Sequence, residues 1–151
     1  MSRSAIRETL GFVGVIASLI FVGLEIQQNT LASRAAAIQE STNVARQQIQ
    51  MFATNPELIR ISIIADEDPS QLNDVERERD RMVSLSFWWG MQGLYRQWTL
   101  GVLPNEDWQA WYRVICSNLE SPSQRAFWEG EQVFIPEFIE IIESCDSFQG
   151  A

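Results

Sequence analysis

Acidic side chains are the most numerous groups in this sequence that could take part in chemistry. The chain has 151 residues, of which 20 are Asp or Glu, 11 are Lys or Arg and none is His. Near the C-terminus, Glu137, Glu140 and Glu143 recur at a spacing that places them on one side of a helix. A solvated helical face has the same spacing, so these carboxylates by themselves do not indicate a general acid and base.

Two side chains that enzymes often use are missing. Every side-chain cation is an arginine, because the sequence contains neither lysine nor histidine. Without histidine there is no Ser-His-Asp or Cys-His pair and no histidine-ligated metal. Without lysine there is no Schiff base and no Walker-A lysine. A net charge of −9 argues against nucleic acid as a partner. The composition therefore predicts no enzyme, no cofactor and no metal site.

The two cysteines, Cys116 and Cys145, fall on two different predicted helices. Two thiols without a histidine make a poor metal site, and no Cys-x-x-Cys motif is present. In an oxidising compartment they could form a disulfide, worth on the order of 3 kcal/mol. In the cytoplasm they would be two small buried apolar residues. The sequence leaves both alternatives open.

Six tryptophans fall in one stretch of the C-terminal half. They are expected to pack in an aromatic core or against a partner, because each indole buries a large area. Two alternatives are a place at the membrane surface and a ring cage for a cationic or flat ligand. The residues are Trp88, Trp89, Trp98, Trp108, Trp111 and Trp128.

An apolar stretch near the N-terminus precedes the tryptophans and the cysteines. The segment from Thr9 to Ile26 carries no charge before Glu25. As a helix it would rise about 27 Å, close to the roughly 30 Å hydrocarbon core of a bilayer. We therefore predict a transmembrane helix at about residues 9–26. A buried core helix and a signal peptide are alternatives, although no small-x-small cleavage site follows. Arg3 and Arg7 before the span favour a C-terminal domain outside the cytoplasm.

Small residues within this span fall on one face together with an acid. They are Gly11, Gly14, Ser18 and Glu25. Such a face lets transmembrane helices approach closely and associate through packing. We name these four residues the small-residue face and predict that it associates with another helix, with incidental composition as the alternative.

Good helix formers continue beyond the span without a breaker, so one helix is predicted from about residue 6 to residue 53. Apolar and small residues in its second half alternate in steps of four and three, which predicts a narrow seam that packs along another helix, either from the same domain or from a neighbouring subunit. The seam consists of Leu31, Ala35, Ile38, Thr42, Ala45, Ile49 and Phe52.

Local start and stop signals predict that the remainder is helical. Starts are expected at Pro56, at Asn73 or Asp74, at Pro104, at Pro122 and at Pro136. Gly101 is placed to end the longest of these helices. Gly90 and Gly93 within that helix predict tight packing, with a ligand pocket as the alternative. The expected fold is all-α, with residues 1–53 as the transmembrane helix and its extension, and residues 54–148 as a bundle of four or five short helices.

Several of these segments together resemble an uncharacterised family of small bacterial single-pass membrane proteins with a tryptophan-rich helical C-terminal domain. The resemblance covers about residues 15–143. Members commonly carry an arginine near the position of Gln27, which this chain lacks. The resemblance implies that the protein lies in the bacterial inner membrane, and it implies no established activity. The matching motifs are Gly23-Leu24-Glu25-Ile26-Gln27-Gln28-Asn29-Thr30, Asn55-Pro56-Glu57-Leu58, Tyr95-Arg96-Gln97-Trp98 with Gly101, Trp108, Ser121-Pro122 with Trp128, and Phe134-x-Pro136-Glu137-Phe138.

These patterns together predict a membrane-anchored helical protein that acts through assembly. It would be a homo-oligomer or an accessory subunit of a larger membrane complex. One alternative is a homo-oligomeric pore with Ser18 facing the lumen and Glu25 at its mouth. Another is a module that binds a small apolar ligand, a lipid or a pigment against the tryptophans.

Overall fold

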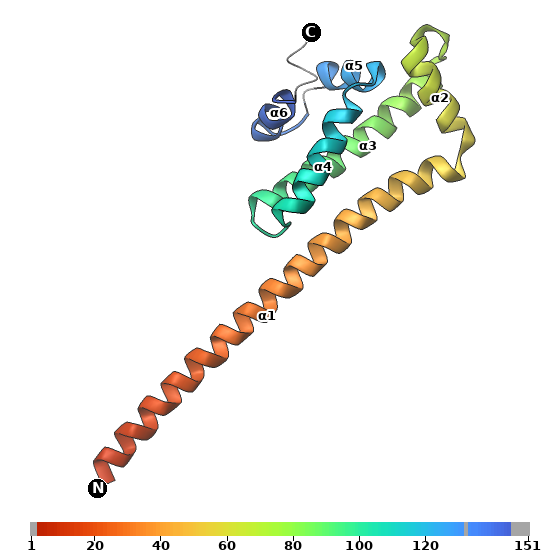
Figure 1. Cartoon of the computed structure of the whole chain (residues 1–151). Coiled ribbons are helices and arrows are strands. Elements are labelled where there is room, and N and C mark those ends of the chain that lie inside the picture. The colour runs from red at the N-terminus through yellow and green to blue at the C-terminus, as the bar shows by residue number, and fades with distance from the viewer. Residues whose placement is uncertain (1–2, 132, 146–151) are drawn as a thin grey trace. The chain divides into compact units, whose positions relative to one another are not determined.

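A computed structural model describes residues 3–131 and 133–145, with side chains described from residue 11 onward. The fold is all-α, as predicted: the described residues form six α-helices, one short 3-10 helix and no strand (Figure 1). Five shorter α-helices follow the long first one. The helices are α1 (Arg3–Thr54), α2 (Pro56–Glu67), α3 (Asp74–Thr99), α4 (Asn105–Asn118), α5 (Pro122–Gly130) and α6 (Pro136–Glu143), with the 3-10 helix η1 at Pro69–Gln71.

The chain divides into two compact units, and the boundary falls within α1, between Ala36 and Ala37. The first unit holds the apolar part of α1. The second holds the last turns of α1 together with α2 to α6. The sequence-based boundary lies later, at residue 54, because a composition pattern marks where a helix ends and not which residues contact one another.

Helix α3 begins at Asp74, where the sequence predicts its start. Asn73 Oδ1 accepts a hydrogen bond from the Glu76 backbone N–H at 3.0 Å, and Glu76 Oε2 accepts one from the Asn73 N–H at 2.9 Å. This reciprocal capping box satisfies two N–H groups that the helix itself leaves free.

Helix α3 ends at Thr99, two residues before the glycine that was predicted to end it. Gly101 has a φ of 70°, a left-handed conformation that costs glycine little. Its N–H donates to the Trp98 carbonyl at 2.8 Å, and the Val102 N–H donates to the Gln97 carbonyl at 2.9 Å. These two bonds make a Schellman motif, which ends the helix and satisfies its last carbonyls.

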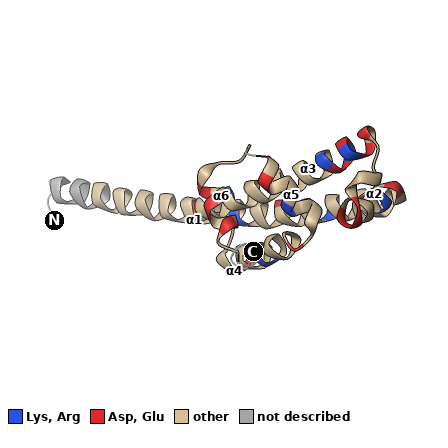
Figure 2. Ribbon diagram, turned by 90° about the horizontal axis from the view of Figure 1, so that it is seen from above, with Lys and Arg blue, Asp and Glu red and all other residues tan. Residues whose placement is uncertain are grey.

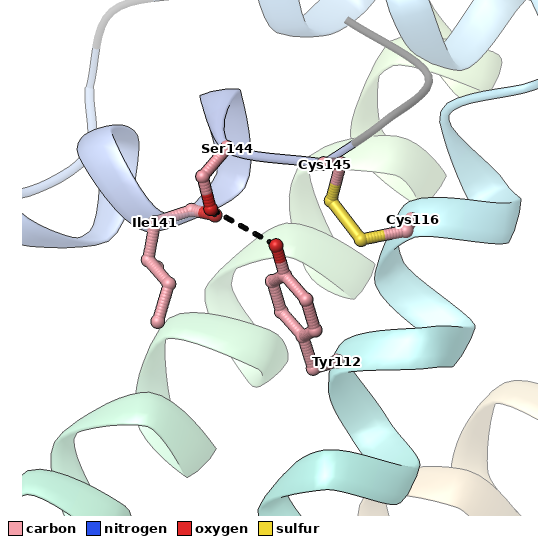
Figure 3. Close-up of a disulfide and its surroundings, with 5 residues drawn as sticks. All are labelled: Tyr112, Cys116, Ile141, Ser144 and Cys145. Atoms are coloured by element: carbon pink, nitrogen blue, oxygen red, sulfur yellow. Dashed lines mark hydrogen bonds between the residues drawn. A yellow bond between two sulfur atoms is a disulfide. The ribbon is translucent and has the colours of Figure 1, made fainter. Parts of the chain in front are cut away.

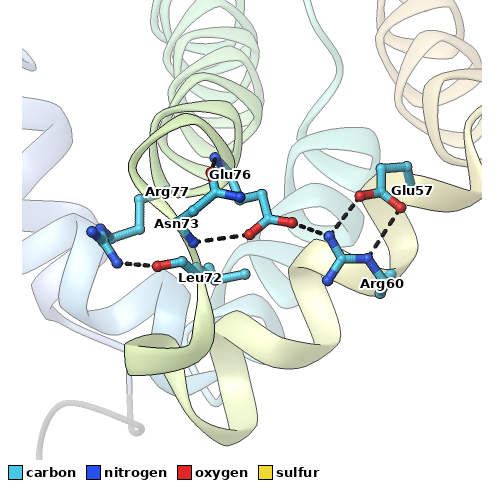
Figure 4. Close-up of polar contacts among 6 residues, drawn as sticks. All are labelled: Glu57, Arg60, Leu72, Asn73, Glu76 and Arg77. Carbon is cyan, nitrogen blue, oxygen red and sulfur yellow. Dashed lines mark hydrogen bonds and ion pairs between the residues drawn. The ribbon is translucent and has the colours of Figure 1, made fainter.

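Charged side chains join α2 to the start of α3. Arg60 contacts Glu57, one turn away on α2, and also Glu76 of α3 (Figure 4). The Asn73 backbone bond and the Arg60 guanidinium lower the pKa of Glu76. The pairing of α2 with α3 is a tertiary contact that the sequence does not indicate.

The core of the second unit is built around α3. Trp88, Met91 and Leu94 of α3 are fully buried against residues of the later helices, and Ala37 of α1 joins the same cluster. The later helices contribute Trp108, Ile115, Leu119, Trp128, Phe138 and Ile142. A second, smaller cluster joins Ile61 and Ala65 of α2 to Leu72. Each set recurs at helical spacing, so burial of one face per helix explains the packing.

The packing face of α1 in the second unit differs from the predicted seam. Ala37 and Ser41 are buried, whereas Ile38 and Ile49 are 41 % and 69 % exposed. Successive residues of a helix are rotated by about 100°, so the seam lies beside the buried face and not on it. The face that packs in the core instead carries the small residues Ala37 and Ser41.

The close approach of α3 to α1 explains why small residues lie where the two helices meet. A Cβ placed on Gly90 would lie 3.1 Å from Cγ1 of Val44 in α1. Gly90 thus packs tightly, as predicted. The same prediction for Gly93 is wrong within the described residues, because a Cβ on Gly93 would meet nothing within 4 Å.

Candidate functional site: the apolar helix and the association surfaces

The first unit exposes apolar side chains in succession. Within the residues that the structure describes, one helix is long and apolar enough to cross a membrane, from Gly11 onward. Phe12, Leu19 and Phe21 are each about two-thirds exposed, and no charged residue occurs from Gly11 to Leu24 (Figure 2). A helix that is apolar on all sides and unburied satisfies its backbone internally, which is what a bilayer requires.

The small-residue face lies within this segment. A Cβ on either Gly11 or Gly14 would meet nothing within 4 Å. The Ser18 hydroxyl donates to the Gly14 carbonyl of its own helix at 2.9 Å. That bond satisfies the hydroxyl proton inside the helix, so Ser18 can lie against an apolar neighbour at little cost. Glu25 is exposed at the end of the segment.

The part of the seam in the second unit forms an apolar surface that α3 does not cover. We name Ile38, Thr42, Ala45, Ile49 and Phe52 the outer seam. Ile38, Thr42 and Ile49 are exposed, and Ala45 and Phe52 are half-buried. The steps of four and three match the spacing at which two helices pack along one another.

The six tryptophans are divided between the core and the surface. Trp88, Trp108 and Trp128 are buried, and Trp98 and Trp111 are half-buried. The rings of Trp98 and Trp108 stack with centroids 5.2 Å apart, and those of Trp88 and Trp128 lie 4.6 Å apart. These rings therefore fill the space between α3, α4 and α5.

Trp89 departs from this pattern because 52 % of it is exposed. Its ring lies 6.3 Å from that of Phe134, and Met82 of the same helix is 49 % exposed. The sequence predicts the same packing for all six tryptophans. Apolar residues surround Trp88 and Trp89 on every side of α3, so no polar side distinguishes a buried ring from an exposed one.

A disulfide joins Cys116 of α4 to Cys145, with their Cα atoms 5.5 Å apart (Figure 3). Cys145 lies just beyond the end of α6, whereas the sequence pattern placed it on that helix. The Tyr112 and Ser144 hydroxyls lie 3.0 Å apart beside it. The disulfide and this contact both hold the end of α6 against α4.

The three acidic residues of α6 lie on its solvent-exposed side. Glu137, Glu140 and Glu143 are all exposed. Burial raises the pKa of the Tyr95 hydroxyl, and the nearby charges of Glu137 and Glu140 raise it further. Within residues 3–131 and 133–145, no group of three metal-binding side chains converges on a common point.

Comparisons with known proteins leave the expected family relationship as a prediction. The chain matches no family model, and no curated protein or solved structure shows significant similarity to it.

Proposed function

We propose that the protein is a single-pass membrane protein of the bacterial inner membrane that acts through assembly, as a homo-oligomer or as an accessory subunit. The observation that carries the proposal is the exposed apolar surface of α1. In the first unit this surface suits lipid, and the outer seam of the second unit suits another helix. An apolar stripe left in water would be a liability for a soluble monomer.

Homo-oligomerisation is supported by the symmetry of the outer seam. Copies anchored in one bilayer lie parallel and at the same depth. Each residue of the seam would then face the same residue of its neighbour, so that Ile38 meets Ile38 and Ile49 meets Ile49. Equal side chains at equal heights satisfy the packing of a parallel coiled coil.

The disulfide supports the orientation in which the second unit lies outside the cytoplasm. Disulfides persist in oxidising compartments such as the periplasm and are rare in the cytosol. The arginines before the span favour the same orientation through the positive-inside rule.

The test is the mass of the purified protein in detergent, measured by light scattering with the detergent contribution subtracted. We expect a mass of two or more chains. Substituting Ile49→Glu in the outer seam should shift the protein towards the monomer, because it places like charges opposite one another. Gln47→Glu, at an exposed site outside the seam, is the matched control and should leave the mass unchanged.

The small-residue face is tested with two glycines in the same apolar segment. Gly14→Leu should weaken association, whereas Gly23→Leu, on the opposite side of the helix, should not. Neither site has a neighbour within 4 Å in the isolated chain, so both changes are tolerated by the monomer. A monomeric wild-type protein that copurifies with no other chain would overturn the proposal.

A further inference from the structure

A cavity of about 470 Å³ lies between α2, α3 and α5 in the second unit, and no residue of α1 lines it. This volume falls within the range typical of small-molecule sites. Its walls are largely apolar, with Leu72 and Phe127 among them, and two carboxylates, Asp66 and Asp80, line the same space.

The two carboxylates differ in their hydrogen-bond partners. Asp66 Oδ1 accepts hydrogen bonds from the Ser121 hydroxyl at 2.6 Å and from the Ser123 N–H at 3.1 Å, where α5 begins. Asp80 accepts no hydrogen bond and forms no ion pair with any described residue, and it is half-buried. Burial, and then the negative charge of Asp66, raise the pKa of Asp80 to about 6.

The cations that line the cavity are engaged elsewhere. Arg77 contacts Asp74 and the Leu72 carbonyl. Arg81 binds Glu78 at 2.9 Å and Glu131 at 2.8 Å. Among the described residues, Asp66 and Asp80 therefore have no ion-pair partner of opposite charge.

The backbone adds to this unbalanced negative charge. Asp66 lies in the last turn of α2, where the helix dipole is negative, and that turn contains no basic residue. A cation in the cavity would thus be favoured by two carboxylates and by a helix end.

We propose that this cavity binds a small organic cation, an ammonium group on an apolar body, with Asp80 as its main ion-pair partner and Asp66 beside it. The apolar body lies against Leu72 and Phe127. A lysine from a second copy cannot be the ligand, because the chain contains no lysine. The proposal is independent of assembly, since none of its residues lies on α1.

Calorimetric titration of the full-length protein in detergent with benzylamine tests the proposal. We expect saturable binding that is about tenfold tighter at pH 7.5 than at pH 5, because the ligand requires ionised Asp80. Near pH 6, binding should release about half a proton, which is measured by comparing buffers of different ionisation enthalpy. Benzyl alcohol, which has the same ring without the charge, should bind at least tenfold more weakly.

Two variants complete the test. Asp80→Asn should weaken benzylamine binding at least tenfold and abolish proton release, while Asp107→Asn on α4, outside the cavity, should change neither. Absence of saturable binding, equal binding of benzyl alcohol, or equal loss in both variants would each overturn the proposal. The mass of the protein in detergent is read separately, so failure here leaves the proposed assembly untouched.

Discussion

At the scale of single residues, Gly90 and Gly93 of α3 lie in different surroundings although three positions separate them. Alanine in a helix interior is about 1 kcal/mol more favourable than glycine. We expect Gly93→Ala to raise the free energy of unfolding by about that amount, because its Cβ would meet nothing within 4 Å. Gly90→Ala should gain less or lose stability, because its Cβ would lie 3.1 Å from Val44 Cγ1. Urea unfolding followed by circular dichroism measures both. Equal gains would show that α1 does not approach α3 closely.

Asp80 gives a pH dependence whose sign follows from its environment. Its pKa is about 6 in the folded protein and near 3.9 in an unfolded chain, so the unfolded state loses its proton first as the pH rises. The free energy of unfolding should therefore fall between about pH 4 and pH 6, as far as Asp80 contributes.

Asp80→Asn should remove this contribution and raise stability at pH 7. We expect a gain on the order of 1 kcal/mol, reduced from the full shift because Asp80 is only half-buried. Urea unfolding at pH 4.5 and pH 7 checks the prediction, with Glu40→Gln, an exposed acid in the interior of α1, as the control. A variant that is less stable than wild type at pH 7 would contradict it.

The residues that matter at this scale were only partly predictable. Asn73 and Gly101 could be identified because capping depends on a few neighbouring residues. Asp80 could not, because it stands in a stretch of alternating charges that reads as a solvated face. Its burial results from the approach of α2 and α5, which local sequence does not encode.

At the scale of the helices, the turn after α3 depends on one backbone conformation. Gly101→Ala should lower the free energy of unfolding by about 1 kcal/mol, because φ is 70° and a Cβ is unfavourable there. Gly130, at the end of α5, has no positive φ and no neighbour within 4 Å, so Gly130→Ala should be neutral or stabilising. Chemical unfolding of the pair measures the difference. If Gly101→Ala lowers the free energy of unfolding no more than Gly130→Ala does, the motif does not determine the end of α3.

The second half of α1 carries two adjacent faces, and only one of them is covered by other residues that the structure describes. The face with Ala37 and Ser41 packs in the core, and the outer seam beside it is exposed or half-buried. Periodicity could predict that α1 is a helix and that apolar residues recur on one side. It could not predict which face the chain covers, because a small residue that permits close approach gives a weak apolar signal.

At the scale of the whole molecule, the disulfide fixes the last helix to α4. It closes a loop with a sequence separation of 29, for which the chain-entropy relation gives about 3.6 kcal/mol. We expect reduction, or Cys145→Ser, to lower the free energy of unfolding by roughly this amount. The measurement is urea unfolding with and without reductant. Unchanged stability on reduction would contradict the prediction.

The same cysteines report where the second unit lies. If it lies outside the cytoplasm, a membrane-permeant maleimide added to intact cells should label neither cysteine until a reductant is present. Labelling without reductant would argue for a cytoplasmic location. The all-α fold and its helix order were predictable because capping and periodicity act locally. The state of the two thiols was not, because it depends on the compartment and on the distance between two segments.

The stacked rings of Trp98 and Trp108 have an optical consequence. Two indoles with centroids 5.2 Å apart and planes only 16° from parallel couple their electronic transitions. Such a pair gives a circular dichroism couplet that disappears when the rings separate. Because the two rings come from α3 and α4, the folded protein carries a spectroscopic reporter of that contact, and separation of these helices can be followed without a dye.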